Sequence, residues 1–234
     1  MNKLIQQELL NLINMKKGQY ILFALICFCF VGWGITQDIQ ITKLKQHHTI
    51  KYEKYSYLYD CMMEAELNYL ETKIKLVKEV QNYISSVAPT SNLRGYAVVE
   101  ECVKYNTDIC FVLAQGEIES HFGTMGLGSK FNNVCNVDVH DKVKGKHDMN
   151  KKYIYEYPNQ SIEPYLQLLN KNYLVDKLES DLLQNYVDIN GSRYASDENY
   201  EEKMRFKYKH IIENTNIANL QMELRNYAIK CNRI

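Results

Sequence analysis

An uncharged apolar run from Tyr20 to Ile35 limits what this chain can fold into more than any other feature. Its sixteen residues would form a helix of roughly 24 Å, and the flanking residues bring this close to the ~30 Å of a bilayer's hydrocarbon core. Two lysines precede the run and an aspartate follows it. The sequence therefore predicts a transmembrane helix over residues 19–37, after a short N-terminal segment of residues 1–18.

A second interpretation of the same run is a cleaved signal peptide. Gly32-Trp33-Gly34 has the small-x-small form of a signal-peptidase site. We favour a retained anchor, because the segment that precedes the run is long for a signal peptide. Lysines lie on both sides of the run, so the positive-inside rule alone does not decide the orientation.

Charge and cysteine usage exclude two kinds of function. The chain has 28 basic and 28 acidic residues, which leaves no excess positive charge to neutralise nucleic-acid phosphates. Its seven cysteines form no CxxC pair, and the histidines lie elsewhere, so no metal site is expected. The length of 234 residues suits one domain of ordinary size with extra segments.

Residues 38–88 are expected to form a helical stalk. Apolar residues recur there in alternating steps of four and three, which is the spacing of a coiled coil. They are Met63, Leu67, Leu70, Ile74, Val77 and Ile84. Two interpretations stay open: a coiled coil that joins two copies of the chain, and a single helix that packs on its own domain.

Residues 89–234 are expected to form a mainly helical (α+β) domain with a small β-hairpin. A hairpin turn is predicted at Val143–Lys146, within a β region from Val134 to Tyr157. Thr107 and Ser196 are predicted helix caps, and residues 123–133 a Gly- and Asn-rich loop. The expected helices cover about 93–105, 107–121, 161–178, 179–190 and 200–213.

Glu119 ends an apolar helix face just before that Gly-rich loop. An apolar setting keeps a carboxyl group protonated to higher pH, which suits a general acid. Glu117 lies elsewhere around the helix and is expected to be solvated. On spacing alone, a glutamate at a helix end is more often a surface residue.

Four blocks of sequence change those odds, because they resemble the glucosaminidase domains of bacteria. In chain order they are LAQGEIESHFGT, NNVCNV, YPNQSIEPY and YASDENYEEK, which begin at residues 113, 132, 157 and 194. They are similar to the family's LAQAALESGWG, NNLFGI, Y-S/P…ESI…DY and YATDPNYAEKI. The resemblance covers roughly residues 90–212. It implies a lysozyme-like fold and hydrolysis of the peptidoglycan glycan strand, without a metal or organic cofactor.

The resemblance also implies roles for individual residues. Glu119 would be the general acid and Tyr194 a cleft tyrosine. A second carboxylate would stand on the first hairpin strand, where this chain has Asp141, unless the sugar's own 2-acetamido group serves instead. Alternatives to Asp141 are Asp138, Asp148 and Glu156. The residues expected to bind substrate are Gln115, Ser120, Phe122, Asn133, Tyr157 and Asn199.

The chain departs from the family's pattern at two places. His121 and Phe122 replace a small residue and a tryptophan, and both are expected to reshape a sugar subsite. Cys135 and Asn136 stand where Phe-Gly is common. Cys135 is expected to be a small buried hydrophobe rather than a reactive thiol.

The expected protein is a membrane-anchored endo-N-acetylglucosaminidase that binds peptidoglycan strands and no nucleic acid. Its N-terminus would be cytoplasmic and its catalytic domain outside the membrane, or it would lie in the membrane or interior of a phage particle. One alternative is a lytic transglycosylase or muramidase, because Glu119 begins an E-S-x-F motif. The other is a non-catalytic membrane or virion protein that kept the fold.

Overall fold

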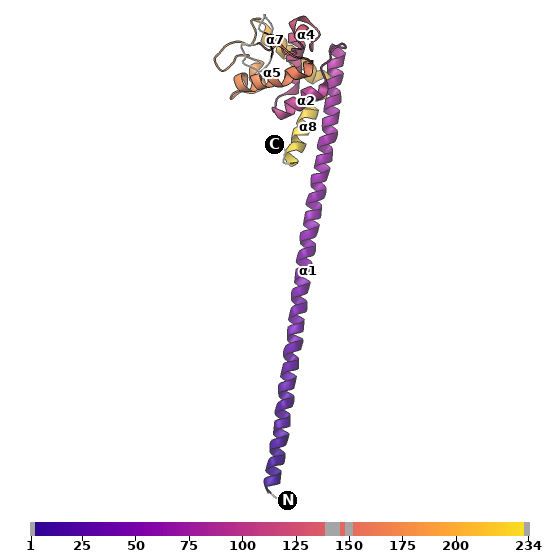
Figure 1. The fold of residues 1–234 in the computed structure, drawn as a ribbon, viewed down its shortest axis with the longest axis vertical. Helices are drawn as coiled ribbons and strands as arrows, with labels where there is room; N and C mark the ends of the chain where they lie inside the picture. Colours follow the sequence, from indigo (N-terminus) through magenta and orange to yellow (C-terminus); the bar gives the residue numbers. More distant parts are fainter. Residues whose placement is uncertain (1–2, 139–145, 148–151, 232–234) are drawn as a thin grey trace. The chain divides into compact units, whose positions relative to one another are not determined.

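The computed structural model describes residues 3–138, 146–147 and 152–231, and for 3–38 and 146–147 it describes the backbone alone. The chain divides into two compact units, Met1–Met62 and Met63–Ile234. The first unit consists of the first part of helix α1 (Lys3–Val87), shown in indigo and purple in Figure 1. All its described side chains, from residue 39 onwards, are exposed.

No helix within the described side chains is long and apolar enough to cross a membrane. The predicted transmembrane segment, residues 19–37, lies outside those side chains.

The second unit begins inside the predicted stalk, because the last part of α1 packs into the core. The boundary therefore lies at Met63 rather than at residue 89. The buried side chains recur every three or four residues, which is the period of one helix face. They are Tyr69, Thr72, Leu76, Val80 and Tyr83, with Ile84 next to the last of them.

Most of the predicted heptad stripe lies on a different face of α1 and is exposed. Met63, Leu67, Leu70 and Ile74 are between 46% and 69% exposed, and Val77 is half-buried. Ile84 is the one member that is buried among the described residues of the stripe. Periodicity shows that a helix has an apolar face, but two such faces are present here.

Helix α3 (Ile109–Ser120) is the centre of the second unit. Every residue from Ile109 to Glu117 is buried, as expected of a helix covered on all sides. It packs against the other long helices of the unit and against short helix α4. These are α2 (Gly95–Lys104), α4 (Gly126–Phe131), α7 (Tyr200–Asn214) and α8 (Ile217–Lys230).

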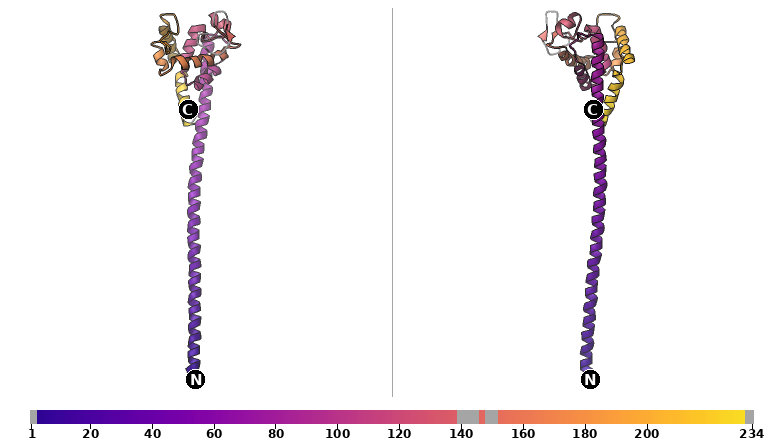
Figure 2. Two further views of the ribbon diagram at one scale, coloured as in Figure 1. Left: turned by 60° about the vertical axis from the view of Figure 1, so that its left-hand side comes forward. Right: turned by 90° about the vertical axis from the view of Figure 1, so that its right-hand side faces the viewer.

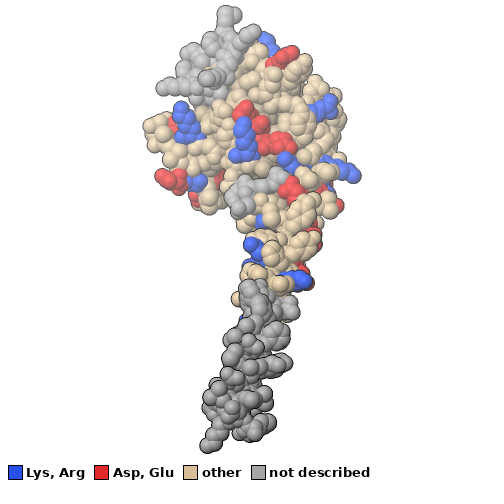
Figure 3. Space-filling model, turned by 60° about the horizontal axis from the view of Figure 1, so that its bottom comes forward, with Lys and Arg blue, Asp and Glu red and all other residues tan. Residues whose placement is uncertain are grey.

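Helix α8 was not expected from the sequence, and it lies beside the last part of α1 in Figures 1 and 2. Tyr69 of α1 lines one small cavity together with Leu224 and Ala228 of α8. In the face of the molecule shown in Figure 3, acidic and basic side chains are mixed.

Several predicted helix ends differ in the structure. Asp108, not Thr107, caps α3, and its carboxylate accepts hydrogen bonds from two backbone N–H groups of the first turn. Asn199, not Ser196, is the residue before α7. The predicted loop over 123–133 contains helix α4.

The predicted helix over 161–178 is three shorter elements. They are the 3₁₀ helix η2 (Pro158–Ser161), α5 (Ile162–Leu168) and the π-helix η3 (Leu169–Tyr173). Helix α6 (Glu179–Leu182) ends eight residues before the predicted end at Asn190.

The small β-hairpin is present, with its turn elsewhere. Strand β1 (Lys146–His147) pairs antiparallel with β2 (Tyr153–Ile154), so that Lys146 lies opposite Ile154. The connection of this hairpin therefore lies between His147 and Tyr153. Of the turn predicted at Val143–Lys146, Lys146 lies in β1 and the other three residues lie outside the described residues. Asp141 and Asp148 lie outside the described residues.

Candidate active site

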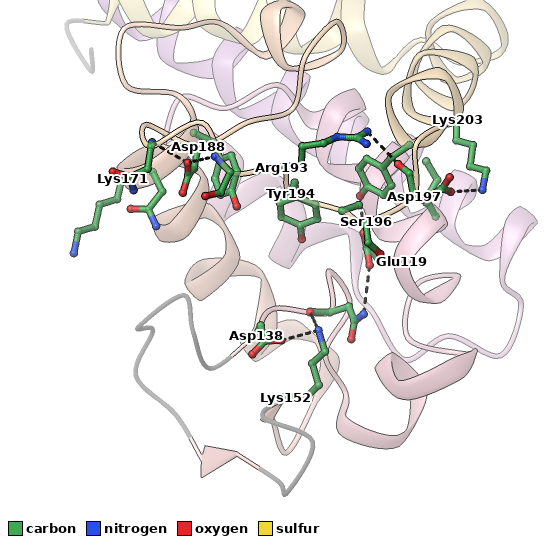
Figure 4. A pocket seen from close by; sticks show the side chains of 18 residues that line it. Glu119, Asp138, Lys152, Lys171, Asp188, Arg193, Tyr194, Ser196, Asp197 and Lys203 are labelled. Carbon is green, nitrogen blue, oxygen red and sulfur yellow. Dashed lines mark hydrogen bonds and ion pairs between the residues drawn. The ribbon is translucent and has the colours of Figure 1, made fainter.

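A cleft of about 860 Å³ opens in the second unit. Its walls come from the end of α3, residues 136–138, Lys152, residues 171–173, and the loop that leads from residue 188 into α7. Figure 4 shows Glu119 between Tyr194 on one side and the Lys152–Asp138 pair on the other. Charged side chains along the cleft are Glu119, Asp138, Lys152, Lys171, Asp188, Arg193, Asp197 and Lys203.

Glu119 is the carboxyl group best suited to hold a proton in this cleft. Tyr200 Oη donates a hydrogen bond to Glu119 Oε1 at 2.5 Å, and Asn136 Nδ2 lies 3.5 Å from Oε2. Burial raises the pKa of Glu119, and these two donors and the charge of Lys152 oppose the rise without cancelling it. The net rise in pKa favours the protonated form that a general acid needs.

The chain turns sharply after Glu119. His121 and Phe122 both adopt left-handed backbone, with φ of 51° and 55°, which is costly for side chains of this size. The end of α1 and the segment after it hold this turn. Ser91 Oγ donates to the carbonyl of Phe122 at 2.6 Å, and the His121 ring lies 2.9 Å from the carbonyl of Val87.

The same turn places His121 and Phe122 outside the residues that line the cleft. Phe122 is 1% exposed and packs edge-on against Tyr83 of α1, with ring centroids 6.1 Å apart. The expectation that these two residues reshape a sugar subsite is therefore not met. Their contacts with the end of α1 and with Ser91 instead hold the chain directly after Glu119.

Tyr194 lines the cleft as the sequence predicted. Its backbone N–H donates to the carbonyl of Tyr186 at 2.9 Å, and the two rings stack at 4.6 Å. Its hydroxyl donates to the carbonyl of Cys135 at 2.9 Å. Arg193 pairs with Glu201 of α7 at 2.7 Å, which ties this loop to the helix that follows.

The candidates for a second carboxylate are placed differently. Asp138 lines the cleft and pairs with Lys152 at 3.5 Å. Lys152 also donates to the carbonyl of Asn136 at 2.9 Å, so it holds the segment next to Glu119. Glu156 is exposed and is not among the residues that line the cleft.

Within the described part of the chain, none of the six predicted substrate-binding residues lines the cleft. Gln115 is buried and accepts hydrogen bonds from the hydroxyls of Tyr165 and Tyr186. Ser120 donates to the carbonyl of Val134 at 2.6 Å. The amide of Asn133 donates to the carbonyls of Val137 and Tyr153.

These three residues therefore support the backbone around the acid. The other three lie elsewhere. Phe122 is in the core, Tyr157 is 58% exposed, and Asn199 is exposed at the start of α7.

Glu117 is buried, not solvated as predicted. It is 8% exposed, accepts a hydrogen bond from Tyr83 Oη at 2.6 Å, and forms an ion pair with Lys207 of α7. This carboxylate joins α1, α3 and α7 two residues before Glu119. Helical spacing placed it on a separate face, but α3 has neighbours on that face too.

Tyr200, Lys152 and Asn136 are among the cleft residues to which the sequence assigned no role in the site. Tyr200 lies inside the YASDENYEEK block, six residues after Tyr194, so that block contained a signal for it. In the described part of the chain, no three His, Cys, Asp or Glu side chains lie close enough together to hold a metal ion.

A family model described as Glucosaminidase, mannosyl-glycoprotein endo-beta-N-acetylglucosaminidase, matches residues 95–215. The match covers just over half of the 234 residues and contains every described residue that lines the cleft. No curated protein matches the chain.

Proposed function

Because the chain belongs to the glucosaminidase family and is a glycoside hydrolase that acts on peptidoglycan, we propose that it cuts the β-1,4 bond after N-acetylglucosamine with Glu119 as general acid. The observation that carries this proposal is the position of Glu119. Its carboxyl group has a pKa raised by burial and lies in the wall of a cleft of about 860 Å³. Cavities of this size hold ligands in many proteins.

In the first step, Glu119 donates its proton to the glycosidic oxygen. The C1–O bond breaks, and its electron pair remains on that oxygen, which leaves as a hydroxyl group. Glu119 becomes a carboxylate, which Tyr200 and Asn136 stabilise because their donors already face its two oxygens. Water completes the reaction: its oxygen forms the new bond to C1, and the proton that it loses restores Glu119.

The electron-poor C1 must then be stabilised, either by a carboxylate or by the oxygen of the sugar's own acetamido group. Asp138 is a candidate because it lines the cleft with Glu119, and Asp141 is the candidate from the family resemblance. Comparing Asp138→Asn, Asp141→Asn, Asp148→Asn and Glu156→Gln on one substrate distinguishes a carboxylate from the acetamido group. A large loss in one variant names the carboxylate. Near-normal activity in all four, with inhibition by thiazoline analogues, favours the acetamido route.

Mass spectrometry of the fragments released from purified sacculi tests the proposed bond. A new N-acetylglucosamine reducing end supports it. A muramic acid reducing end would indicate a muramidase, and a 1,6-anhydro end would indicate a lytic transglycosylase. If no fragment is released, the protein is a non-catalytic member of the fold.

We further propose that residues 19–37 anchor the enzyme in a membrane, with the N-terminus cytoplasmic and the catalytic domain outside. The support is the uncharged run from Tyr20 to Ile35 together with a substrate that lies outside the cytoplasmic membrane. The arrangement suits a bacterial wall-remodelling enzyme or one carried in a phage particle. Protease added to intact spheroplasts should digest the chain after residue 38, and protection of the catalytic domain would reverse the orientation.

A second copy of the chain is our proposed partner for the exposed stripe on α1. Met63, Leu67, Leu70 and Ile74 are spaced as in a coiled coil and are exposed. From residue 39 to 64 every side chain is exposed, and a helix without packing is marginal in water. Sedimentation of the detergent-solubilised full chain should give a dimer that Leu67→Glu dissociates, and a monomeric wild-type protein would refute the partner.

A further inference from the structure

Asn136 is a residue by which this chain differs from the family it resembles. It stands where glycine is common, and its backbone is left-handed, with φ of 54°. Glycine adopts this conformation freely, and asparagine is one of the few other residues that tolerate it. The chain therefore keeps the turn and adds an amide side chain where the family commonly has none.

That amide lies in the cleft beside the acid. Its Nδ2 faces Glu119 Oε2 at 3.5 Å, which is long for a hydrogen bond, and catalytic contacts of this kind often shorten when substrate binds. The carbonyl of Asn136 accepts a hydrogen bond from Lys152 at 2.9 Å, which fixes the backbone that carries the amide. Figure 4 shows this link between Glu119 and the Lys152–Asp138 pair.

The other end of the amide has no partner within the described part of the chain. Asn136 Oδ1 is buried and accepts no hydrogen bond from any of the described residues. An unsatisfied buried acceptor is unfavourable, and a native structure usually has a reason to keep one. Asn136 itself lines the cleft, so a small outward movement of its side chain would bring this oxygen to a ligand with a hydrogen bond donor.

We propose that Asn136 binds the 2-acetamido group of the sugar next to the bond that is cut, with Oδ1 accepting its N–H and Nδ2 holding Glu119. This inference rests on the proposed function, because it takes an N-acetylated amino sugar as substrate. The acetamido group is attached to C2, beside the C1 whose bond Glu119 protonates. Asn136 Oδ1 lies next to Glu119, so in the proposed complex it is close to the acetamido group.

The proposal predicts a binding defect that is separable from catalysis. In a Glu119→Gln background, which lacks the acid, binding of N-acetylglucosamine tetramer is measured with and without Asn136→Gly. Leaving the sugar's N–H unpaired should weaken binding by about 5- to 100-fold. Asn106→Gly is the matched control, because Asn106 has φ of 50° but is exposed outside the cleft.

A second readout follows from the contact with Glu119. An N–H that faces a carboxylate lowers its pKa, so Asn136→Gly in the otherwise unchanged enzyme should raise the pKa of Glu119. The alkaline limb of the pH–activity profile should move to higher pH. The other groups that act on Glu119 or are acted on by it stay in place: Cys135, Lys152, Tyr194 and Tyr200.

Both Asn→Gly variants should fold, since glycine adopts the left-handed backbone without strain. Equal tetramer binding with and without Asn136→Gly, or an equal loss in Asn106→Gly, would overturn the inference. An unmoved alkaline limb would overturn the contact with Glu119. If the Glu119→Gln parent binds no tetramer and the wild-type enzyme releases nothing from sacculi, the proposed function itself fails.

Discussion

Replacing Tyr200 by phenylalanine removes one hydroxyl group and keeps the ring. Tyr200 is 4% exposed, its hydroxyl donates to Glu119 at 2.5 Å, and its ring packs 5.7 Å from that of Tyr194. A hydrogen bond to a charged group contributes about 1.5–3 kcal/mol. Each ~1.4 kcal/mol is a factor of ten in rate, so complete loss of the bond in the transition state would slow the enzyme about 10- to 150-fold.

The carboxylate is only partly formed in the transition state, so we expect kcat to fall by about 3- to 100-fold with little change in KM. The alkaline limb of the pH profile should move to higher pH, because a donor that favours the carboxylate is lost. The kinetic constants and the pH profile are measured on soluble glycan fragments. Tyr186→Phe is the control, since Tyr186 is buried in the same aromatic cluster but donates to Gln115. An unchanged kcat and pH profile in Tyr200→Phe, or the same changes in the control, would refute this role.

Three further changes test the fold and the buried charges. Asp108→Ala removes the cap of α3 and should cost about 1 kcal/mol, seen as a melting temperature lower by about 2–4 °C; an unchanged value would contradict the cap. Lys207→Met leaves the buried Glu117 without its ion pair and should lower the melting temperature, while adding Glu117→Gln should restore part of it; additive losses would contradict the pairing. Glu119→Gln should melt at a higher temperature than the wild type at pH 8. The pKa of Glu119 is higher in the folded protein than in the unfolded one, so the ionised carboxylate lowers the stability of the wild type at that pH. The difference in melting temperature should vanish below the pKa of Glu119 in the unfolded chain, about 4.3. Equal melting curves at pH 8 would show that ionised Glu119 carries no such cost.

Glu119 and Tyr194 are the residues of the site that the sequence predicts best. The resemblance placed Glu119 and Tyr194, and both line the cleft. Motif matching works for these two because each lies inside a short block of sequence that resembles the family. Gln115, Ser120 and Asn133 were also placed by the motifs, but their side chains bond to neighbouring groups away from the cleft, because a motif match gives a position in the chain and not the direction of a side chain.

The contacts between distant segments could not be read from the sequence. Glu117 is 34 residues from Tyr83 and 90 from Lys207, and no local pattern joins them. Two apolar faces on α1 follow the same helical period, so spacing could not indicate that Leu76 is buried while Ile74 is exposed. Both features depend on tertiary packing, which decides what covers each face.

Turnover of purified sacculi by Glu119→Gln tests the central claim most directly. The change is nearly isosteric and removes the proton that the glycosidic oxygen must receive. General acid catalysis contributes about 10²–10⁴-fold, so we expect fragment release to fall by that factor while the circular dichroism spectrum stays that of the wild type. Release within about threefold of the wild type would contradict Glu119 as the acid, because that loss is far smaller than general acid catalysis contributes.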